Sequence, residues 1–265
     1  FYTKQFENLS VNPEKLAVAG SNKDISWKEL KEETDELCAV FTKLNIPKGH
    51  PVIIYGHKEC FFMAAILACI RSNIPYIPLD KVMPVERVKK IQQISGSQVL
   101  ISSGEKNEEL KFALEIDELL TINNNNTPNY TENIYWHEHD PIIYIMFTSG
   151  STGEPKGVQI THEALSSYLD WMEKDYGFTQ DDVFMNQAPF SFDLSVYEIM
   201  FSLHLGASLI LNSSEITKDG RQFIKRIKEY HCSVWVSTPS FAYLYLSEPD
   251  FNSAPLPHLK TFLFC

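Results

Sequence analysis

The residues best suited to chemistry form one short segment, 148–157, which reads Thr-Ser-Gly-Ser-Thr-Gly-Glu-Pro-Lys-Gly. It directly follows an apolar, β-prone run at Ile142–Phe147. Glycine permits the backbone conformations that turn successive N–H groups into one concavity, and such a concavity binds phosphate. The hydroxyl groups add donors, and the lysine adds a mobile positive charge. The segment therefore predicts a phosphate-binding loop with the candidate ligands Thr148, Ser149, Gly150, Ser151, Thr152, Gly153 and Lys156.

The composition of this segment also fits a flexible surface loop, because glycine and serine are common there. That alternative explains the glycines but not so many donors beside a lysine, directly after a strand of the buried type. Two better-known phosphate loops are excluded by spacing. A Walker loop needs Gly-Lys-Ser/Thr, whereas Lys156 lies between Pro155 and Gly157. Gly150, Gly153 and Gly157 also lack the spacing of the dinucleotide-binding fingerprint.

A second candidate is Asp193, which lies inside the apolar run 188–197, Ala-Pro-Phe-Ser-Phe-Asp-Leu-Ser-Val-Tyr. A carboxylate in such surroundings is costly to bury unless a partner compensates its charge. Asp193 either pairs with the ammonium group of a substrate or caps a helix that runs through Val196, with help from Ser195. The residues alone leave these two roles open.

The elements that position these residues alternate between strands and helices. Ser26 and Glu29 have capping-box spacing, which predicts a helix from Trp27 to about Leu44. Thr161 is the expected N-cap of a later helix with one apolar face. The residues of that face are Leu165, Tyr168, Leu169, Met172 and Tyr176.

Further apolar runs extend this alternation. Residues 76–79 contain a proline and are expected to form a strand at a sheet edge. Residues 122–129 are expected to be an inserted surface loop. Together the runs predict an α/β fold with largely parallel sheets. The other expected strands are 51–55 and 98–102, and the other expected helices are 60–72 and 84–94.

Composition and charge limit the class of protein. With 44% hydrophobic and 22% charged residues, the 265-residue chain can build an ordinary globular core. The formal net charge of −11 argues against nucleic-acid binding, which needs clustered Lys and Arg. Five cysteines without CxxC spacing indicate reduced thiols and a cytoplasmic protein. The longest apolar run, Cys60–Ile70, is too short to span a bilayer. The tract 136–140 (Trp-His-Glu-His-Asp) lacks helical ligand spacing, so no metal site is predicted.

Segment 148–157 resembles the phosphate-loop signature of the adenylate-forming enzymes, the family of amino-acid adenylation domains, acyl-CoA synthetases and luciferases. Residues 25–30, 76–80 and 186–195 resemble other motifs in the family's order. The resemblance runs along essentially the whole chain. It implies an α/β fold, namely the large N-terminal domain with its αβαβα arrangement of sheets and helices.

The resemblance also implies which part of such an enzyme is present. Residues 1–265 are expected to be the N-terminal part of the large adenylation domain. Within it, 1–140 would be a first α/β region, and 141–265 would carry the phosphate loop and the substrate pocket. The family's adenine-binding segment, ribose-binding aspartate and C-terminal catalytic lysine are expected beyond Cys265. We therefore expect the C-terminal half to be missing and this part alone to be inactive.

Segments 186–195, 236–241 and 261–265 are similar to one branch of the family in particular, which charges D-alanine for teichoic acid esterification. This implies a ligase that uses ATP and Mg²⁺, with Lys156 as the catalytic residue that offsets phosphate charge. The implied partners are D-alanine or another small amino acid and a phosphopantetheinylated acyl carrier protein. The alternatives are an adenylation domain for another small amino acid, an acyl-CoA synthetase, or an ATP-binding or interaction module without this activity.

The same resemblance implies a substrate pocket. It assigns the substrate ammonium to Asp193, which an acyl-CoA synthetase for a fatty acid would not need. Leu194 and Tyr197 are bulky and would leave a pocket suited to a methyl group. In the strand 261–265, successive side chains point to opposite faces, so Leu263 and Cys265 share one face. The alternative to a pocket role for Cys265 is that of an ordinary buried thiol. The implied side-chain pocket consists of Leu194, Tyr197, Val236, Leu263 and Cys265.

Overall fold

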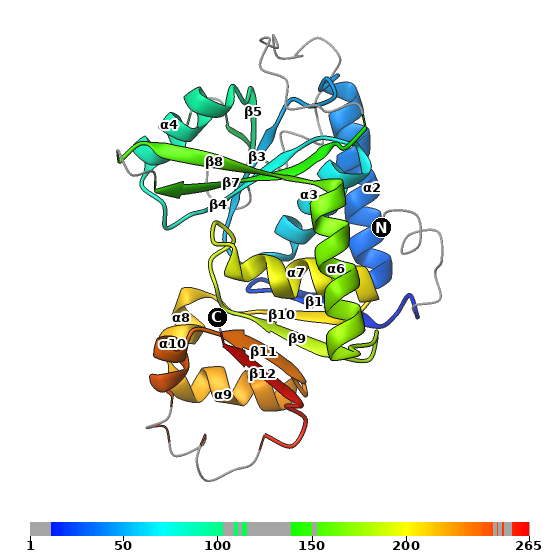
Figure 1. The fold of residues 1–265 in the computed structure, drawn as a ribbon, viewed down its shortest axis with the longest axis vertical. Helices are drawn as coiled ribbons and strands as arrows, with labels where there is room; N and C mark the ends of the chain where they lie inside the picture. The colour runs from blue at the N-terminus through cyan, green and yellow to red at the C-terminus, as the bar shows by residue number, and fades with distance from the viewer. Residues whose placement is uncertain are drawn as a thin grey trace.

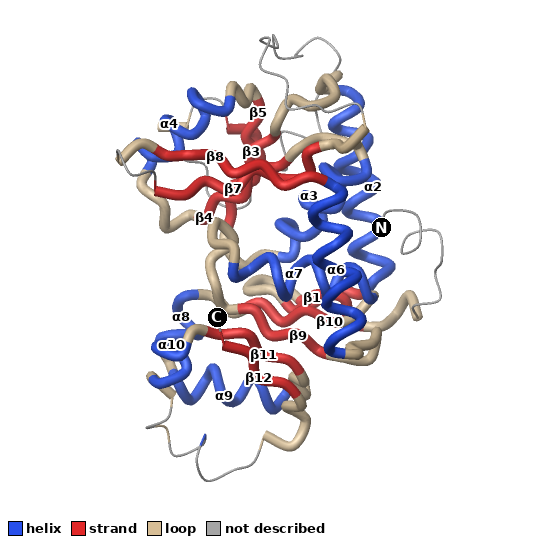
Figure 2. The backbone as a smooth tube through the Cα atoms, in the orientation of Figure 1, coloured by secondary structure: helices blue, strands red, loops and turns tan. Residues whose placement is uncertain are grey.

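The computed structural model forms two six-stranded sheets with helices between and outside them (Figure 1). Figure 2 shows the two sheets as separate groups of strands, with helices lying between them. Within the part of the chain that the structure describes, no helix is long and apolar enough to cross a membrane. The described residues are 12–102, 109–110, 113–115, 139–149, 153–245, 248, 251 and 256–264.

The first sheet has the strand order β6-β5-β3-β4-β7-β8, and its strands are parallel except for the antiparallel pair β7 and β8. Helix α4 (Val85–Ser95) covers its outer face, where Val88 and Ile91 pack with Ile53 and Leu100. The strands are β3 Val52–Gly56, β4 Tyr76–Asp80, β5 Val99–Ser102, β6 Ala113–Glu115, β7 Ile142–Ser149 and β8 Pro155–Thr161.

The second sheet has the order β12-β11-β9-β10-β1-β2 and is parallel except for the pair β1 and β2. Helix α9 (Gly220–Glu229) covers its outer face, where Phe223 and Ile227 pack with Met185 and Trp235. The strands are β1 Leu16–Ala19, β2 Asp24–Ser26, β9 Val183–Asn186, β10 Ser208–Leu211, β11 Val234–Ser237 and β12 Thr261–Phe264. Two short helices are α8 Ser214–Lys218 and α10 Pro239–Tyr243.

A central layer of helices joins the two sheets. One hydrophobic cluster includes residues of these helices, of the first sheet (Val52, Ile143) and of the second sheet (Phe184, Val234). The molecule therefore has five layers, helix–sheet–helix–sheet–helix, which confirms the predicted α/β fold and its αβαβα order. The central helices are α2 Trp27–Lys43, α3 Cys60–Arg71, α6 His162–Tyr176 and α7 Leu194–Leu205.

Strand β3 shows why the central strands are continuous apolar runs. Val52 and Ile54 contact the central helices, whereas Ile53 and Tyr55 belong to the cluster under α4. Successive side chains of a strand point to opposite faces, and both faces of this sheet are covered by helices. Each position in the strand is consequently apolar.

The predicted helix starts are confirmed. The Ser26 side chain accepts from Glu29 N, and the Glu29 carboxylate accepts from Ser26 N at 2.7 Å, so both halves of the capping box are present. The Thr161 side chain accepts from Ala164 N and begins α6. Gly177 ends α6 in the left-handed region, with φ of 61°, which glycine adopts without a steric penalty.

Strand β4 differs from the prediction. The sequence predicts an edge strand because of Pro78, but β4 lies in the sheet interior between β3 and β7. Its pairing with β3 runs over five residues, whereas its pairing with β7 consists of Tyr76 with Tyr144. The short pairing on one side accommodates a residue that has no N–H to donate.

Two other sequence interpretations have different outcomes. Strands β1 and β2, of four and three residues, were not predicted, because such short runs carry little periodicity. The inserted loop expected at 122–129 lies outside the described residues. The division of the chain at residue 140 stays a prediction, and the first sheet takes strands from both sides of it.

Candidate functional site

The segment expected to bind phosphate connects β7 to β8. The antiparallel pairing of these strands continues to Thr148 with Lys156 and Ser149 with Pro155. Thr148, Ser149 and Lys156 are exposed, although the preceding six residues of β7 are buried. The β7–β8 hairpin therefore presents two hydroxyls and one ammonium near its tip, where a ligand can reach them. Three members of the predicted ligand set, Gly150, Ser151 and Thr152, lie outside the described residues.

Two glycines of this hairpin are required for different reasons. Gly153 has φ of +83°, a left-handed conformation that residues with a Cβ rarely adopt. At Gly157 an added Cβ would lie 2.9 Å from Ile145 Cγ2 and 3.1 Å from Phe147 Cζ. The first glycine serves the turn, and the second serves the close packing of β8 on β7. A left-handed residue such as Gly153 is a common part of the turns that bind anions through backbone N–H groups.

Helix α4 contacts the same hairpin through an ion pair. Lys90 Nζ lies 2.5 Å from the Glu154 carboxylate, and both side chains are about half exposed. Lys89 pairs with Glu86 on the same helix at 2.8 Å. This charged helix face is in contact with solvent, and an exposed pair such as Lys90–Glu154 contributes little stability.

A cavity of about 800 Å³ lies beside β7 and β8, between α6 and the segment that leads into α7. Its volume is within the range of small-molecule sites. Its walls are mostly apolar and aromatic, as is usual for such sites. The lining residues are Tyr144, Ile160, Ala164, Leu165, Tyr168, Gln187, Ala188, Pro189, Phe192, Asp193, Leu194, Val196, Tyr197, Thr238 and Phe241.

Asp193 lies on the wall of this cavity and is exposed. Its Oδ1 accepts a hydrogen bond from Leu194 N at 2.9 Å, and it is the N-cap of α7. The N-cap role that the sequence left open is thus confirmed. Burial, the larger cause, and the nearby charge of Asp193 together raise the pKa of Tyr144 to about 12. Tyr144 is consequently a neutral hydrogen-bonding group in the cavity wall.

The other predicted pocket residues divide into three groups. Leu194 and Tyr197 line the cavity. Val236 and Leu263 are paired neighbours on β11 and β12 and pack into the central core, outside the set of lining residues. Cys265 lies outside the described residues. The structure therefore brings Asp193, Leu194 and Tyr197 together, and the methyl-sized subsite stays a prediction.

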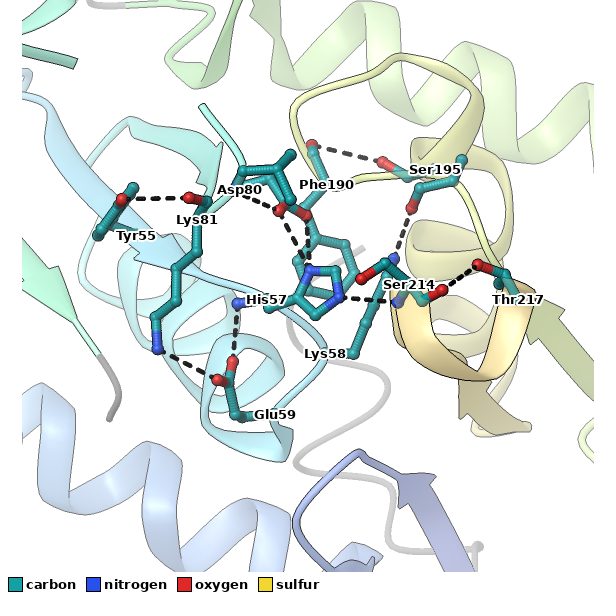
Figure 3. A network of polar contacts seen from close by, with 12 residues as sticks. Tyr55, His57, Lys58, Glu59, Asp80, Lys81, Phe190, Ser195, Ser214 and Thr217 are labelled. Carbon is teal, nitrogen blue, oxygen red and sulfur yellow. Dashed lines mark hydrogen bonds and ion pairs between the residues drawn. The ribbon is translucent and has the colours of Figure 1, made fainter. Parts of the chain in front are cut away.

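A polar cluster that the sequence analysis missed begins at His57, after β3 (Figure 3). His57 Nδ1 lies 3.1 Å from both oxygens of Asp80, which is fully buried at the end of β4. Ser214 N donates to His57 Nε2 at 3.1 Å. Because Nε2 accepts, the hydrogen-bond network assigns the ring proton to Nδ1, which donates to the carboxylate. His57 therefore joins the first sheet to the start of α8 beside the second.

The next residue, Lys58, is also buried. Its ammonium donates hydrogen bonds within the segment 186–190, which is far away in the sequence. Glu198 on α7 is fully buried as well, and its carboxylate oxygens make no hydrogen bond of standard geometry among the described residues. Burial raises the pKa of Glu198 to about 8, and the charge of Lys58 opposes this shift. These residues lie directly behind the cavity wall.

A sequence signal for this cluster exists. Glu198 is the one acidic residue in the apolar helix segment 194–205, and Lys58 lies two residues before the apolar run that begins at Cys60. A charged residue in a segment expected to be buried needs a compensating group. The sequence does not show that Lys58 and Glu198 lie close enough for their charges to interact, because they are far apart along the chain.

The described residues contain no group of three or more His, Cys, Asp or Glu side chains placed to hold a metal ion. Of the tract 136–140, only His139 and Asp140 are described. The exposed hydroxyls of Thr148 and Ser149 and the ammonium of Lys156 are suited to phosphate oxygens. This donor set fits the phosphate groups of a nucleotide better than it fits a bare metal ion.

Fold and site together define the class of protein. The sequence matches the family described as AMP-binding enzyme over residues 6–265, and the chain belongs to this family. Its fold is that of the large N-terminal domain of adenylate-forming enzymes.

Curated relatives narrow the comparison. The chain is 34% identical over 267 residues to the D-alanine--D-alanyl carrier protein ligase of Bacillus anthracis, covering 99% of this chain and 52% of the relative. It is 36% identical to the ligase of the same name from Bacillus cytotoxicus, covering 96% and 51%. The chain spans about half the length of these relatives.

Solved structures agree on the fold. An o-succinylbenzoate CoA synthetase from Bacillus subtilis, in complex with its acyl-adenylate intermediate, matches with a TM-score of 0.81 and 17% identity, covering 100% of this chain and 68% of that one. A four-domain nonribosomal peptide synthetase bound to AMP and glycine matches with a TM-score of 0.76 and 22% identity, covering 93% and 18%.

Proposed function

We propose that this chain is the N-terminal part of a ligase that activates D-alanine as D-alanyl-AMP and transfers it to a carrier protein. The observation that carries this proposal is the position of Asp193. Among the described residues that line the cavity, it is the charged one, and the wall around it is apolar. A carboxylate in such a setting suits the ammonium of an amino acid. The identity to D-alanine--D-alanyl carrier protein ligases along nearly the whole chain supports D-alanine as the substrate.

In the proposed first step, a carboxylate oxygen of D-alanine attacks the α-phosphorus of ATP, and the bond to the bridging oxygen breaks to release pyrophosphate. Two anions approach each other in this step, so positioning and charge compensation carry much of the catalysis. Thr148, Ser149 and Lys156 would hold the departing phosphates, together with the backbone of the loop at 150–153. Mg²⁺ bound with ATP would offset further phosphate charge.

In the proposed second step, the phosphopantetheine thiol of the carrier protein attacks the acyl carbon. A thioester forms, and AMP leaves with the electrons of the broken acyl–phosphate bond. The proposal includes D-alanylation of teichoic acid as the use of this product and the cytoplasm as its location. The latter follows from the sequence argument on reduced cysteines.

Substrate selection within this proposal depends on Leu194, Tyr197, Val236, Leu263 and Cys265. Leu194 and Tyr197 lie on the cavity wall, which supports a role in limiting the size of the side chain. A small subsite would favour a methyl group over larger side chains, because overfilled pockets are strained.

ATP–pyrophosphate exchange tests this proposal on the full-length gene product, with D-alanine, L-alanine, glycine and a short fatty acid as substrates. We expect exchange with D-alanine and much less with the others. Exchange with another amino acid would keep the chemistry and reject the pocket assignment. Exchange with the fatty acid alone would reject Asp193 as the ammonium site.

A further inference from the structure

Lys58 is a lysine that solvent barely reaches, with 1% of its surface exposed, between β3 and α3. Its Nζ donates to Asn186 Oδ1 and to the Ala188 carbonyl oxygen, both at 2.5 Å. The same ammonium lies 3.9 Å from the centroid of the Phe190 ring. All three partners belong to the end of β9 and the connection that follows it.

That connection is one wall of the candidate substrate cavity. Ala188 lines the cavity, and so does Asp193 farther along the same connection. From the opposite side, Gln187 Nε2 donates to the Val236 carbonyl at 2.8 Å, and Trp235 Nε1 donates to Gln187 Oε1 at 3.0 Å. The wall is therefore held between β11 and Lys58.

The contacts of Lys58 are demanding in geometry. An ammonium group is costly to bury unless acceptors and a ring face replace water, and here residues 186–190 supply them. Burial lowers the pKa of Lys58 to about 7, although the charges of Asp80 and Glu198 raise it. A shift of the wall by one ångström would separate the ammonium from its acceptors. The buried lysine consequently favours one position of the wall.

We propose that Lys58 is a positioning residue for the substrate, acting through its bonds to Asn186 and Ala188 to fix the cavity wall that carries Asp193. This inference rests on the proposed function, since it assigns the wall to an amino acid. Lys58 itself is not among the described residues that line the cavity. It comes from the first sheet, so it also sets the wall of the second sheet relative to the β7–β8 hairpin, where ATP would bind.

A purely structural role is the competing explanation. Glu198 is fully buried on α7, and the positive charge of Lys58 favours the charged form of Glu198. If compensation of this carboxylate were the whole role of Lys58, removing both charges together would restore a normal protein. If hydrogen bonding to the wall is the role, removing both charges would leave the wall unsupported. A double variant separates these two explanations.

The experiment compares Lys58→Met, Glu198→Gln and the double variant in the full-length gene product by amino-acid-dependent ATP–pyrophosphate exchange. Methionine keeps much of the apolar stem and removes the donors. We expect Lys58→Met to raise KM for D-alanine about tenfold or more, with KM for ATP changed by less than about twofold. The double variant should keep the raised KM. Lys81→Met is the matched control, because Lys81 pairs with Glu59 at 3.3 Å and not with the wall.

Three results would overturn the proposal: an unchanged KM for D-alanine, equal changes in both KM values, or recovery in the double variant. Hydrogen–deuterium exchange of the peptide covering 186–193 gives a second readout that needs no turnover. Faster exchange there in Lys58→Met and in the double variant, but not in Lys81→Met, is expected. If the wild-type protein shows no amino-acid-dependent ATP–pyrophosphate exchange, the proposed function fails, and so does the role of Lys58 toward the substrate. Faster deuterium uptake would then still identify Lys58 as the support of the wall.

Discussion

At the residue scale, Asp193 is the observed N-cap of α7, and its proposed role toward a substrate ammonium is compatible with that cap. Its Oδ1 accepts from Leu194 N and caps α7, while the side chain remains exposed on the cavity wall. An ammonium group bound there would share the carboxylate with the cap. Since a helix N-terminus favours an anion, the cap also stabilises the charge that the substrate would need.

Asp193→Asn separates these roles. Asparagine caps a helix about as well as aspartate, so we expect the free energy of unfolding to change by less than about 0.5 kcal/mol. Loss of the charge should raise KM for D-alanine by about tenfold or more, because a charge-assisted hydrogen bond to the ammonium is lost. Urea unfolding and ATP–pyrophosphate exchange measure the two quantities. A variant with wild-type KM would remove Asp193 from the proposed site.

Glu198 predicts a pH dependence of stability. Its pKa in the folded protein is raised to about 8 by burial, above the ordinary value of 4.5 for a glutamate. Between these pH values the folded state binds more protons than the unfolded state. The contribution of protonated Glu198 to the free energy of unfolding is therefore complete below pH 4.5 and is lost as pH rises through 8. Relative to Glu198→Gln, the wild type should lose on the order of 1 kcal/mol per pH unit in this window. Urea unfolding at pH 5 and pH 8 checks this, and a constant difference between the two proteins would contradict it.

At the element scale, the sequence predicts what local chemistry determines. The capping box of Ser26 and Glu29 and the cap at Thr161 placed two helix starts correctly, because a cap is satisfied within four residues. The edge-strand prediction from Pro78 was wrong, because a proline is tolerated in this central strand where β4 pairs only briefly with β7. The same limit applies to the site: the 148–157 loop is local, whereas the partner of Lys58 lies 128 residues away in sequence.

Ser26→Ala tests the cap that begins α2. The Glu29 N–H loses its acceptor, and the reciprocal bond loses its geometry, so we expect a loss of about 1 kcal/mol of folding stability. Ser72→Ala is the matched control, because the C-cap of α3 uses the backbone N–H of Ser72. That change should stay within about 0.5 kcal/mol. Equal effects of the two substitutions in urea unfolding would show that the cap contributes nothing specific.

At the scale of the whole molecule, the cavity exists because two sheets meet. Tyr144 and Ile160 come from the first sheet, whereas Gln187 and Thr238 follow strands of the second. His57 and Lys58, which follow β3 of the first sheet, contact the second half of the chain at this meeting (Figure 3). His57 reaches Ser214 across 157 residues of sequence, a pairing that no local pattern could reveal.

His57→Leu should weaken this junction. The fully buried carboxylate of Asp80 would keep the Val82 N–H, at 3.1 Å from Oδ1, but would lose the donor at His57 Nδ1. A buried carboxylate that loses a partner is costly, so we expect a loss of about 2 to 4 kcal/mol in the free energy of unfolding. The double variant His57→Leu/Asp80→Leu removes the stranded charge and should recover part of that loss, since replacing both partners with apolar groups is far less costly than removing one. Urea unfolding of the full-length protein measures all three. If the double variant were as unstable as the sum of the single changes, the two side chains would act independently, and the junction between the sheets would have to depend on packing alone.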